Sequence, residues 1–176
     1  MNVRSFHPKF DEIVALDDKR SAERTHEDAS AWNRKLLSRS IETLRNIVLE
    51  GVFKDGQGLA SVVEMLRKNG YEVTVRIVAV HERFSVWGIN RRYEKEKIVR
   101  GHGRYVPIQY HDDCYRKILD TVSLLEDNRL VDRLEIYNRN GECLYTNTVS
   151  GKEWAEPAGA RIAIERGGVC VGSCRV

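Results

Sequence analysis

Hydrophobic and polar positions follow two different periods along the chain, and each period predicts one type of element. Apolar residues spaced by three or four positions favour amphipathic helices. The predicted helices start near Ala31, Gly58, Glu82, Gln109 and Trp154. Short apolar runs and strict alternation favour strands at residues 47–50, 73–80, 133–137 and 143–146, the last two joined by the hairpin turn Asn140-Gly141. Residues 1–30 fit neither period, and we predict an irregular segment there.

The stretch from Ile47 to Gly51 is the one around which we expect the other elements to be arranged. Its three apolar residues predict a strand buried on both faces, which ends at Glu50. A helix closed by Asn69-Gly70 and the strand at 73–80 follow, so the order predicts a right-handed parallel unit of an α/β sheet. Glu50 would lie where such sheets place ligands, although an ordinary strand end with its acid in water has the same pattern.

Composition narrows the class of protein. A chain of 176 residues with 41% hydrophobic and 31% charged residues suits one globular domain. No apolar run approaches the ~20 residues that span a bilayer, and no leader pattern opens the chain, so we expect a cytoplasmic protein without a membrane partner. The four cysteines, at 114, 143, 170 and 174, are too scattered for a disulfide framework or a zinc site, and we predict no metal ligands.

Charge is concentrated in one segment. Residues 91–104 hold six Lys or Arg against two Glu, a local charge of +4 that exceeds the +3 of the whole chain. Such a run is usually a solvated helix face, but Gly101 and Gly103 break it, as in a lid that closes over phosphates. Nucleic-acid binding is the weaker alternative, because no aromatic residues suited to base stacking are interleaved with the charges.

Seven short motifs occur in an order that resembles the zeta-toxin family. They are His7-Pro8-x-Phe10-Asp11, Ala29-Ser30-x-Trp32, Asn46-Ile47-Val48-Leu49-Glu50-Gly51, Gly70-Tyr71-Glu72-Val73, Arg92-Tyr93-Glu94, Arg104 followed by His111-Asp112, and Ile136-Tyr137-Asn138-Arg139-Asn140-Gly141. The resemblance covers nearly all of residues 4–166. It implies a P-loop kinase fold with a three-layer parallel sheet. It also implies a toxin, restrained by an antitoxin, that uses ATP and Mg²⁺ to phosphorylate the 3′-hydroxyl of UDP-N-acetylglucosamine or a related UDP-amino sugar.

The resemblance also implies roles for individual residues. Glu50 matches the acid of the family's Glu-Gly-Thr-x-Arg motif, which contacts the sugar nucleotide, and Lys54 stands at that motif's arginine. Arg4 falls in the family's Asp-x-x-Arg-x-x-His-Pro segment, next to the substrate. Arg92 and Arg104 match the two arginines that hold the ATP phosphates and the transferring group.

Several departures from the family pattern bear on activity. No Gly-x-x-x-x-Gly-Lys-Ser/Thr occurs, since the sole Gly-Lys pair, Gly151-Lys152, precedes Glu153. The general-base aspartate falls on Met1, so no catalytic residue is assigned. The motif threonine is Val52, which cannot hydrogen-bond a substrate, and Lys54 lacks arginine's two-pronged geometry.

We therefore interpret residues 1–166 as a partial kinase domain that lacks the first strand, the P-loop and the first helix, followed by an irregular tail at 167–176. Such an amino-terminally truncated member would be catalytically silent. The alternative is a non-enzymatic module that engages an antitoxin or a separate P-loop segment, with the open sheet edge as its contact surface.

Overall fold

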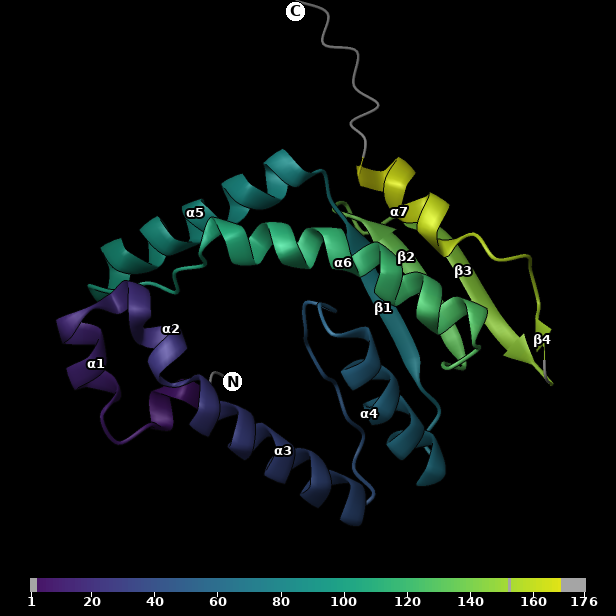
Figure 1. The fold of residues 1–176 in the computed structure, drawn as a ribbon, viewed down its shortest axis with the longest axis horizontal. Helices are drawn as coiled ribbons and strands as arrows, with labels where there is room; N and C mark the ends of the chain where they lie inside the picture. Colours follow the sequence, from purple (N-terminus) through teal and green to yellow (C-terminus); the bar gives the residue numbers. More distant parts are fainter. Residues whose placement is uncertain (1–2, 152, 169–176) are drawn as a thin grey trace, which may run out of the picture. The chain divides into compact units, whose positions relative to one another are not determined.

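The computed structural model describes residues 3–151 and 153–168, which form two compact units (Figure 1). A helical unit comprises residues 1–50 and 86–110, and a sheet unit comprises residues 51–85 and 111–176. The residues of two long helices, α5 (Glu82–Arg100) and α6 (Ile108–Asp127), are divided between the two units. Among the helices described, none is both long and apolar enough to cross a membrane.

The helical unit is built from short helices near the amino terminus. These are η1 (Val3–Phe6), α1 (Phe10–Leu16), η2 (Asp18–Arg20), α2 (Ser21–Arg24) and α3 (His26–Glu42). The carboxylate of Asp17 accepts a hydrogen bond from the backbone N–H of Lys19 at 3.0 Å and so caps η2. The prediction of an irregular segment at residues 1–30 is therefore wrong for 3–6, 10–16, 18–24 and 26–30, because local caps such as Asp17 allow short helices that carry no long apolar period.

The sheet unit contains four strands in the order β1-β2-β3-β4. Their bounds are β1 (Thr74–Ala79), β2 (Arg133–Asn138), β3 (Cys143–Ser150) and β4 (Glu153–Trp154). β1 pairs with β2 in parallel, whereas β2 with β3 and β3 with β4 are antiparallel. The α/β class and the β2–β3 hairpin are confirmed, with Gly141 in the turn at φ 85°. The sheet is mixed: β1 and β2 are parallel as predicted, β3 returns antiparallel as the predicted hairpin requires, and the short β4 was not predicted.

The hydrophobic core lies on one face of this sheet. Val75 and Ile77 of β1 and Leu134 and Ile136 of β2 point to this face, and each is at most 6% exposed. Three helices, α4 (Gly56–Lys68), α6 and α7 (Ala160–Gly168), supply the residues that cover them, namely Val63, Val122, Leu125, Ala160 and Ile164. Burial of each large aliphatic side chain contributes about 1.5–3 kcal/mol to stability. The third layer predicted for the sheet stays a prediction.

Helix α4 begins and ends where its sequence signals indicate. The carboxylate of Asp55 accepts a hydrogen bond from the backbone N–H of Gly58 at 2.9 Å, which caps the first turn. Gly70 follows Asn69 with φ 81°, a left-handed conformation that glycine adopts without steric cost. The predicted helix closed by Asn69-Gly70 is confirmed.

A buried carboxylate fixes the start of α7. Glu126, 4% exposed, accepts hydrogen bonds from the Tyr145 hydroxyl at 2.6 Å and from the backbone N–H groups of Gly159 and Ala160 at 3.2 and 3.1 Å. Burial, together with the hydrogen bond to Glu126, raises the pKa of Tyr145 to about 12. Glu126 therefore ties α6, β3 and the first turn of α7 together.

The strand predicted at residues 47–50 is absent from the structure. Val48 is 90% exposed and Leu49 54% exposed, and in the described part of the chain no strand pairs with this stretch. Leu44 adopts φ 50°, which redirects the backbone just before the stretch. The apolar run predicted burial, but a strand also requires a hydrogen-bonded neighbour, and among the described residues β1 pairs with β2 alone. The parallel unit forms between β1 and β2 instead.

Candidate anion-binding site

Arg4 is held in place by the start of the helical unit. Its guanidinium nitrogen Nη1 donates hydrogen bonds to the carbonyl oxygen of Ala22 at 2.6 Å and to Oγ1 of Thr25 at 2.9 Å. Thr25 is fully buried, and its own hydroxyl donates to the carbonyl oxygen of Ser21 at 2.7 Å. Two acceptors on and beside α2 therefore restrict the half-buried side chain of Arg4.

The electrostatic environment of Arg4 includes a second cation. Burial lowers the pKa of Arg4, the positive charge of Arg104 lowers it further, and Tyr110 acts in the opposite direction. An anion that binds near the two guanidinium groups would offset the effect of the Arg104 charge on Arg4. Arginine can hold phosphate oxygens at two points, so this pair suits a phosphate group.

Arg104 follows the glycine-broken loop at the end of α5. Its backbone N–H donates a hydrogen bond to Oε2 of Glu96 at 2.8 Å, and the N–H of Gly103 donates to Oδ2 of Asp18 at 3.4 Å. Gly101 takes φ 78°, which ends α5 in the left-handed conformation. The backbone of the loop is thus held by two carboxylates, whereas the side chain of Arg104 is exposed.

The other predicted site residues do not share these contacts. Glu50 and Arg92 are exposed residues of the helical unit. Across residues 3–151 and 153–168, no hydrogen bond or ion pair joins Glu50 to Arg92 or Arg104. Lys54 belongs to the sheet unit, where its ammonium group lies 3.5 Å from a carboxylate oxygen of Asp113. Arg4 and Arg104 lie within range of an electrostatic effect on each other's surroundings, since the charge of Arg104 acts on Arg4. The binding roles of all five predicted site residues stay predictions.

Sequence reasoning misses Asp18 and Glu96, the residues that position the loop. Asp18 stands in a charged stretch that has no periodicity, and Glu96 lies in a basic segment where it counts only as one opposing charge. Neither residue type nor spacing indicates that the carboxylates of Asp18 and Glu96 accept hydrogen bonds from the backbone amides of Gly103 and Arg104. The spacing indicates Tyr93 only as an apolar position, although its hydroxyl also contacts Asp18.

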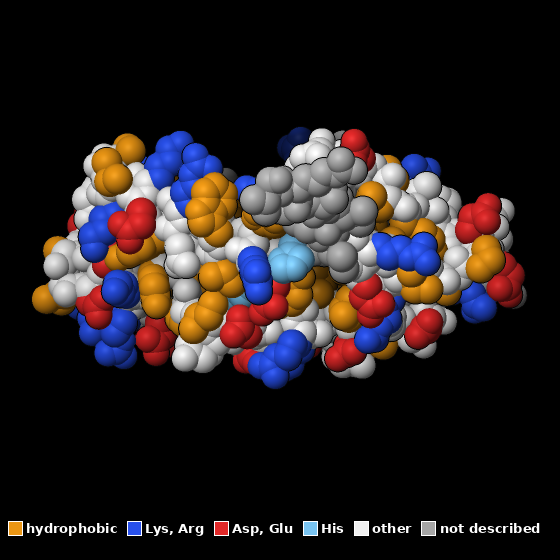
Figure 2. Space-filling view, turned by 90° about the horizontal axis from the view of Figure 1, so that it is seen from above, with side chains coloured by type: hydrophobic (Ala, Val, Ile, Leu, Met, Phe, Trp, Pro, Cys, Tyr) orange, Lys and Arg blue, Asp and Glu red, His pale blue; other side chains and the backbone are white. Residues whose placement is uncertain are grey.

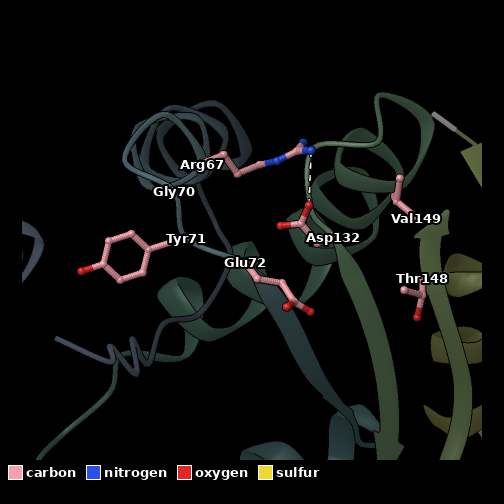
Figure 3. A pocket seen from close by; sticks show the side chains of 7 residues that line it. All are labelled: Arg67, Gly70, Tyr71, Glu72, Asp132, Thr148 and Val149. Atoms are coloured by element: carbon pink, nitrogen blue, oxygen red, sulfur yellow. Dashed lines mark ion pairs between the residues drawn. The ribbon is translucent and has the colours of Figure 1, made fainter. Parts of the chain in front are cut away.

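The sheet unit also contains an open polar pocket of about 500 Å³ (Figure 3). Its lining residues are Arg67, Gly70, Tyr71, Glu72, Asp132, Thr148 and Val149. The guanidinium of Arg67 lies 3.3 Å from the carboxylate of Asp132, and it also donates to the carbonyl oxygens of Arg129 and Leu130. The pocket lies where β1 and β2 begin, whereas open α/β sheets bind ligands at the carboxyl ends of their strands.

The residues that are present do not fit a complete ATP and Mg²⁺ site. The sequence contains no P-loop motif. Among the described residues, no group of three or more His, Cys, Asp or Glu side chains could hold a metal ion. Basic, acidic and hydrophobic side chains are interspersed on the face seen in Figure 2. What the arrangement offers is Arg4, held by two acceptors, on which the positive charge of Arg104 acts.

The fold and the paired arginines define an α/β protein with a candidate phosphate-binding site. Residues 2–150 match the family described as Zeta toxin, and the chain therefore belongs to the zeta toxin family.

The curated relatives are toxins. The chain is 27% identical over 156 residues to Toxin PezT of Streptococcus pneumoniae, covering 86% of this chain and 62% of that protein. It is 28% identical over 155 residues to Toxin zeta of Enterococcus hirae and to Toxin zeta of Streptococcus pyogenes, covering 85% of this chain and 54% of each relative. The chain thus spans between half and two thirds of the length of these relatives.

A solved structure has a similar fold. It comes from the molecular and structural characterization of the PezAT chromosomal toxin–antitoxin system of the human pathogen Streptococcus pneumoniae. The TM-score is 0.72 at 24% identity, and the match covers 94% of this chain and 69% of that chain.

Proposed function

We propose that this chain is the acceptor-binding and lid portion of a zeta-toxin-type phosphotransferase, and that it binds UDP-N-acetylglucosamine or a related UDP-amino sugar. The observation that carries the proposal is that the positive charge of Arg104 acts on Arg4, which the amino-terminal helices hold in place. The resemblance puts Arg4 next to the substrate and Arg104 at an arginine that holds the transferring phosphoryl group, which the substrate hydroxyl receives. The membership in the zeta toxin family supplies the class of ligand.

The charges of the two arginines suit the diphosphate of a sugar nucleotide. Arg4 is already fixed by Ala22 and Thr25, so little side-chain entropy is lost when its guanidinium donates hydrogen bonds to phosphate oxygens. Arg104 is exposed, and an anion between the two cations would offset their mutual repulsion. Glu50 would accept hydrogen bonds from the substrate, and Arg92 would add a further positive charge.

By itself the chain should transfer no phosphate. Phosphoryl transfer depends on a P-loop lysine, on Mg²⁺ and on a residue that orients the nucleophile. The sequence lacks the P-loop motif, and Met1 stands at the position of the general base. The proposed role is therefore binding of the phosphate acceptor, the UDP-amino sugar. We do not propose that these residues bind ATP or Mg²⁺.

Isothermal titration calorimetry with UDP-N-acetylglucosamine tests the proposal. The wild-type chain should bind, and Arg104→Gln should weaken binding at least tenfold, which corresponds to about 1.4 kcal/mol. Arg34→Gln is the matched control, because Arg34 is an exposed arginine on α3 of the same unit. No binding by the wild type, or equal losses in both variants, would contradict the proposal.

An antitoxin is the second candidate partner. The outer edge of β1 has no neighbouring strand within the described residues, and an unpaired edge can accept a strand from another chain. The structural relative comes from a toxin–antitoxin system. If an antitoxin encoded next to this chain's gene binds there, amide hydrogen exchange at β1 should slow in its presence. Unchanged exchange at β1 in a complex that demonstrably forms would exclude this edge.

A further inference from the structure

The helical unit contains a set of contacts that joins its amino-terminal part to the loop carrying Arg104. The carboxylate of Asp18, with a side chain 14% exposed, accepts hydrogen bonds from the Tyr93 hydroxyl at 3.1 Å and from the Gly103 N–H at 3.4 Å. The Lys97 ammonium lies 3.8 Å from the same carboxylate. We call these four residues, Asp18, Tyr93, Lys97 and Gly103, the Asp18 latch.

Tyr93 gives the latch a rigid centre. Its side chain is 6% exposed, and its ring packs edge-on against the ring of Tyr105 with centroids 5.5 Å apart. The Lys97 ammonium donates a hydrogen bond to the Tyr93 hydroxyl at 3.1 Å. That hydrogen bond raises the pKa of Lys97, as does the charge of Asp18, so the lysine stays protonated and keeps this contact. The carboxylate of Asp18 thus meets a hydroxyl whose position is fixed by its surroundings.

Gly103 places the loop directly on α5. A Cβ atom at this position would overlap the carbonyl oxygen of Tyr93 and lie 2.8 Å from its ring atom Cδ2, so only glycine fits without a shift. The next amide, that of Arg104, donates to Glu96 at 2.8 Å. Two successive backbone amides are therefore held by two carboxylates, one from η2 and one from α5.

These contacts oppose the electrostatic force on Arg104. The charges of Arg4 and Arg104 repel each other, and an exposed arginine on an unrestrained loop would move away from its neighbour. Because the backbone on both sides of the Gly103–Arg104 peptide is held, Arg104 can stay near Arg4. We infer that Asp18 and Glu96 are positioning residues, which preorganise the two arginines as an anion site. The functional part of this inference rests on the proposed binding of a phosphate-bearing ligand.

The test uses two readouts on the full chain. Asp18→Asn and Glu96→Gln keep the size of each side chain and remove the charge, and Asp11→Asn is the control because Asp11 is an exposed acid of the same unit. Amide hydrogen exchange by NMR reports the loop, and calorimetry with inorganic pyrophosphate reports the anion site. Either positioning variant should speed exchange at Gly103 and Arg104 at least tenfold and raise the pyrophosphate Kd at least fivefold, while Asp11→Asn changes neither.

Other outcomes separate the inference from the proposed function. Pyrophosphate binding that depends on Asp18, without binding of UDP-N-acetylglucosamine, would support the latch and overturn the proposed substrate. Faster exchange at Gly103 with an unchanged pyrophosphate Kd would overturn the positioning role. A wild-type chain that binds no pyrophosphate would overturn it as well.

A general loss of structure must be distinguished from a local effect. Asp18→Asn could also speed exchange at the buried amides of Thr25 and Ala29, which would indicate a general loss of structure. In that case Tyr93→Phe is used in its place, because it removes only the hydroxyl that contacts Asp18 and keeps the ring. Local loosening of the loop with weaker pyrophosphate binding in Tyr93→Phe supports the inference, and unchanged binding refutes it.

Discussion

Replacing Glu126 by alanine should destabilise the sheet unit by about 3–5 kcal/mol, the cost of leaving buried partners of a charged group unsatisfied. The substitution removes the acceptor for three donors: the hydroxyl of Tyr145 and the backbone N–H groups of Gly159 and Ala160. An unsatisfied buried donor costs about 1–3 kcal/mol, so three donors that regain part of their bonds from water account for this range. Ala160 is fully buried, which limits that recovery.

Urea unfolding followed by tryptophan fluorescence measures this change. Trp154 is a suitable reporter, because its indole nitrogen donates to the carbonyl oxygen of Glu126 at 2.7 Å. Trp32 and Trp87 belong to the helical unit, so the experiment is done in a background where both are phenylalanine. The midpoint should fall with the m-value unchanged if only stability is affected.

Two further variants set the scale. Glu126→Gln keeps one acceptor oxygen but turns an amide group toward a donor, so its loss should be intermediate, at about 1–3 kcal/mol. Asp127→Ala, one residue further along α6 and exposed, should stay within about 0.5 kcal/mol of the wild type. A loss below about 1 kcal/mol in Glu126→Ala would refute the reasoning, because the three bonds would then carry little net energy.

Three further predictions concern the ionisation of Tyr145, the ionisation of Glu135 and the substitution of two glycines. Tyr145 should ionise near pH 12 and not near 10. Its contribution to stability is therefore full below pH 10 and is lost as the pH rises through 12. The tyrosinate absorbance of the wild type minus that of Tyr145→Phe measures the ionisation. Burial raises the pKa of Glu135, but hydrogen bonds from Arg76 and Tyr137 outweigh the effect of burial and leave the pKa below 4.5. The ionised Glu135 therefore stabilises the fold above pH 4.5, and this stabilisation is lost as the pH falls through the lowered pKa. Arg76→Met should therefore flatten the acid limb of the stability curve, and an unaltered acid limb would count against the ion pair. Gly103→Ala should lower the thermal midpoint of the helical unit. Gly88 lies within α5, and a Cβ there would meet no neighbour. Gly88→Ala should therefore raise the thermal midpoint and increase the free energy of unfolding by up to about 1 kcal/mol.

Elements with local signals could be predicted from the sequence. Helix α4 carries its own cap at Asp55 and its own stop at Gly70, and the β2–β3 hairpin is fixed by the turn at Gly141. The strand predicted around Val48 fails because its burial depended on a neighbouring strand, which no local pattern encodes. An apolar run indicates which side chains of a segment can be buried. Whether they are buried depends on the pairing of the segment with a neighbouring strand.

The candidate site is accessible to sequence reasoning only in part. The family resemblance indicates Arg4 and Arg104 by their positions, and the structure adds that the positive charge of Arg104 lowers the pKa of Arg4. The roles of Asp18 and Glu96 depend on hydrogen bonds to the amides of Gly103 and Arg104, and such contacts arise from tertiary structure.

The most direct test of the central claim is an NMR titration that follows the arginine side-chain N–H signals while UDP-N-acetylglucosamine is added. If Arg4 and Arg104 form one site for the diphosphate, both signals should shift with the same Kd, and the signal of Arg34 should stay in place. Shifts that are confined to other arginines, or different Kd values for Arg4 and Arg104, would contradict the account.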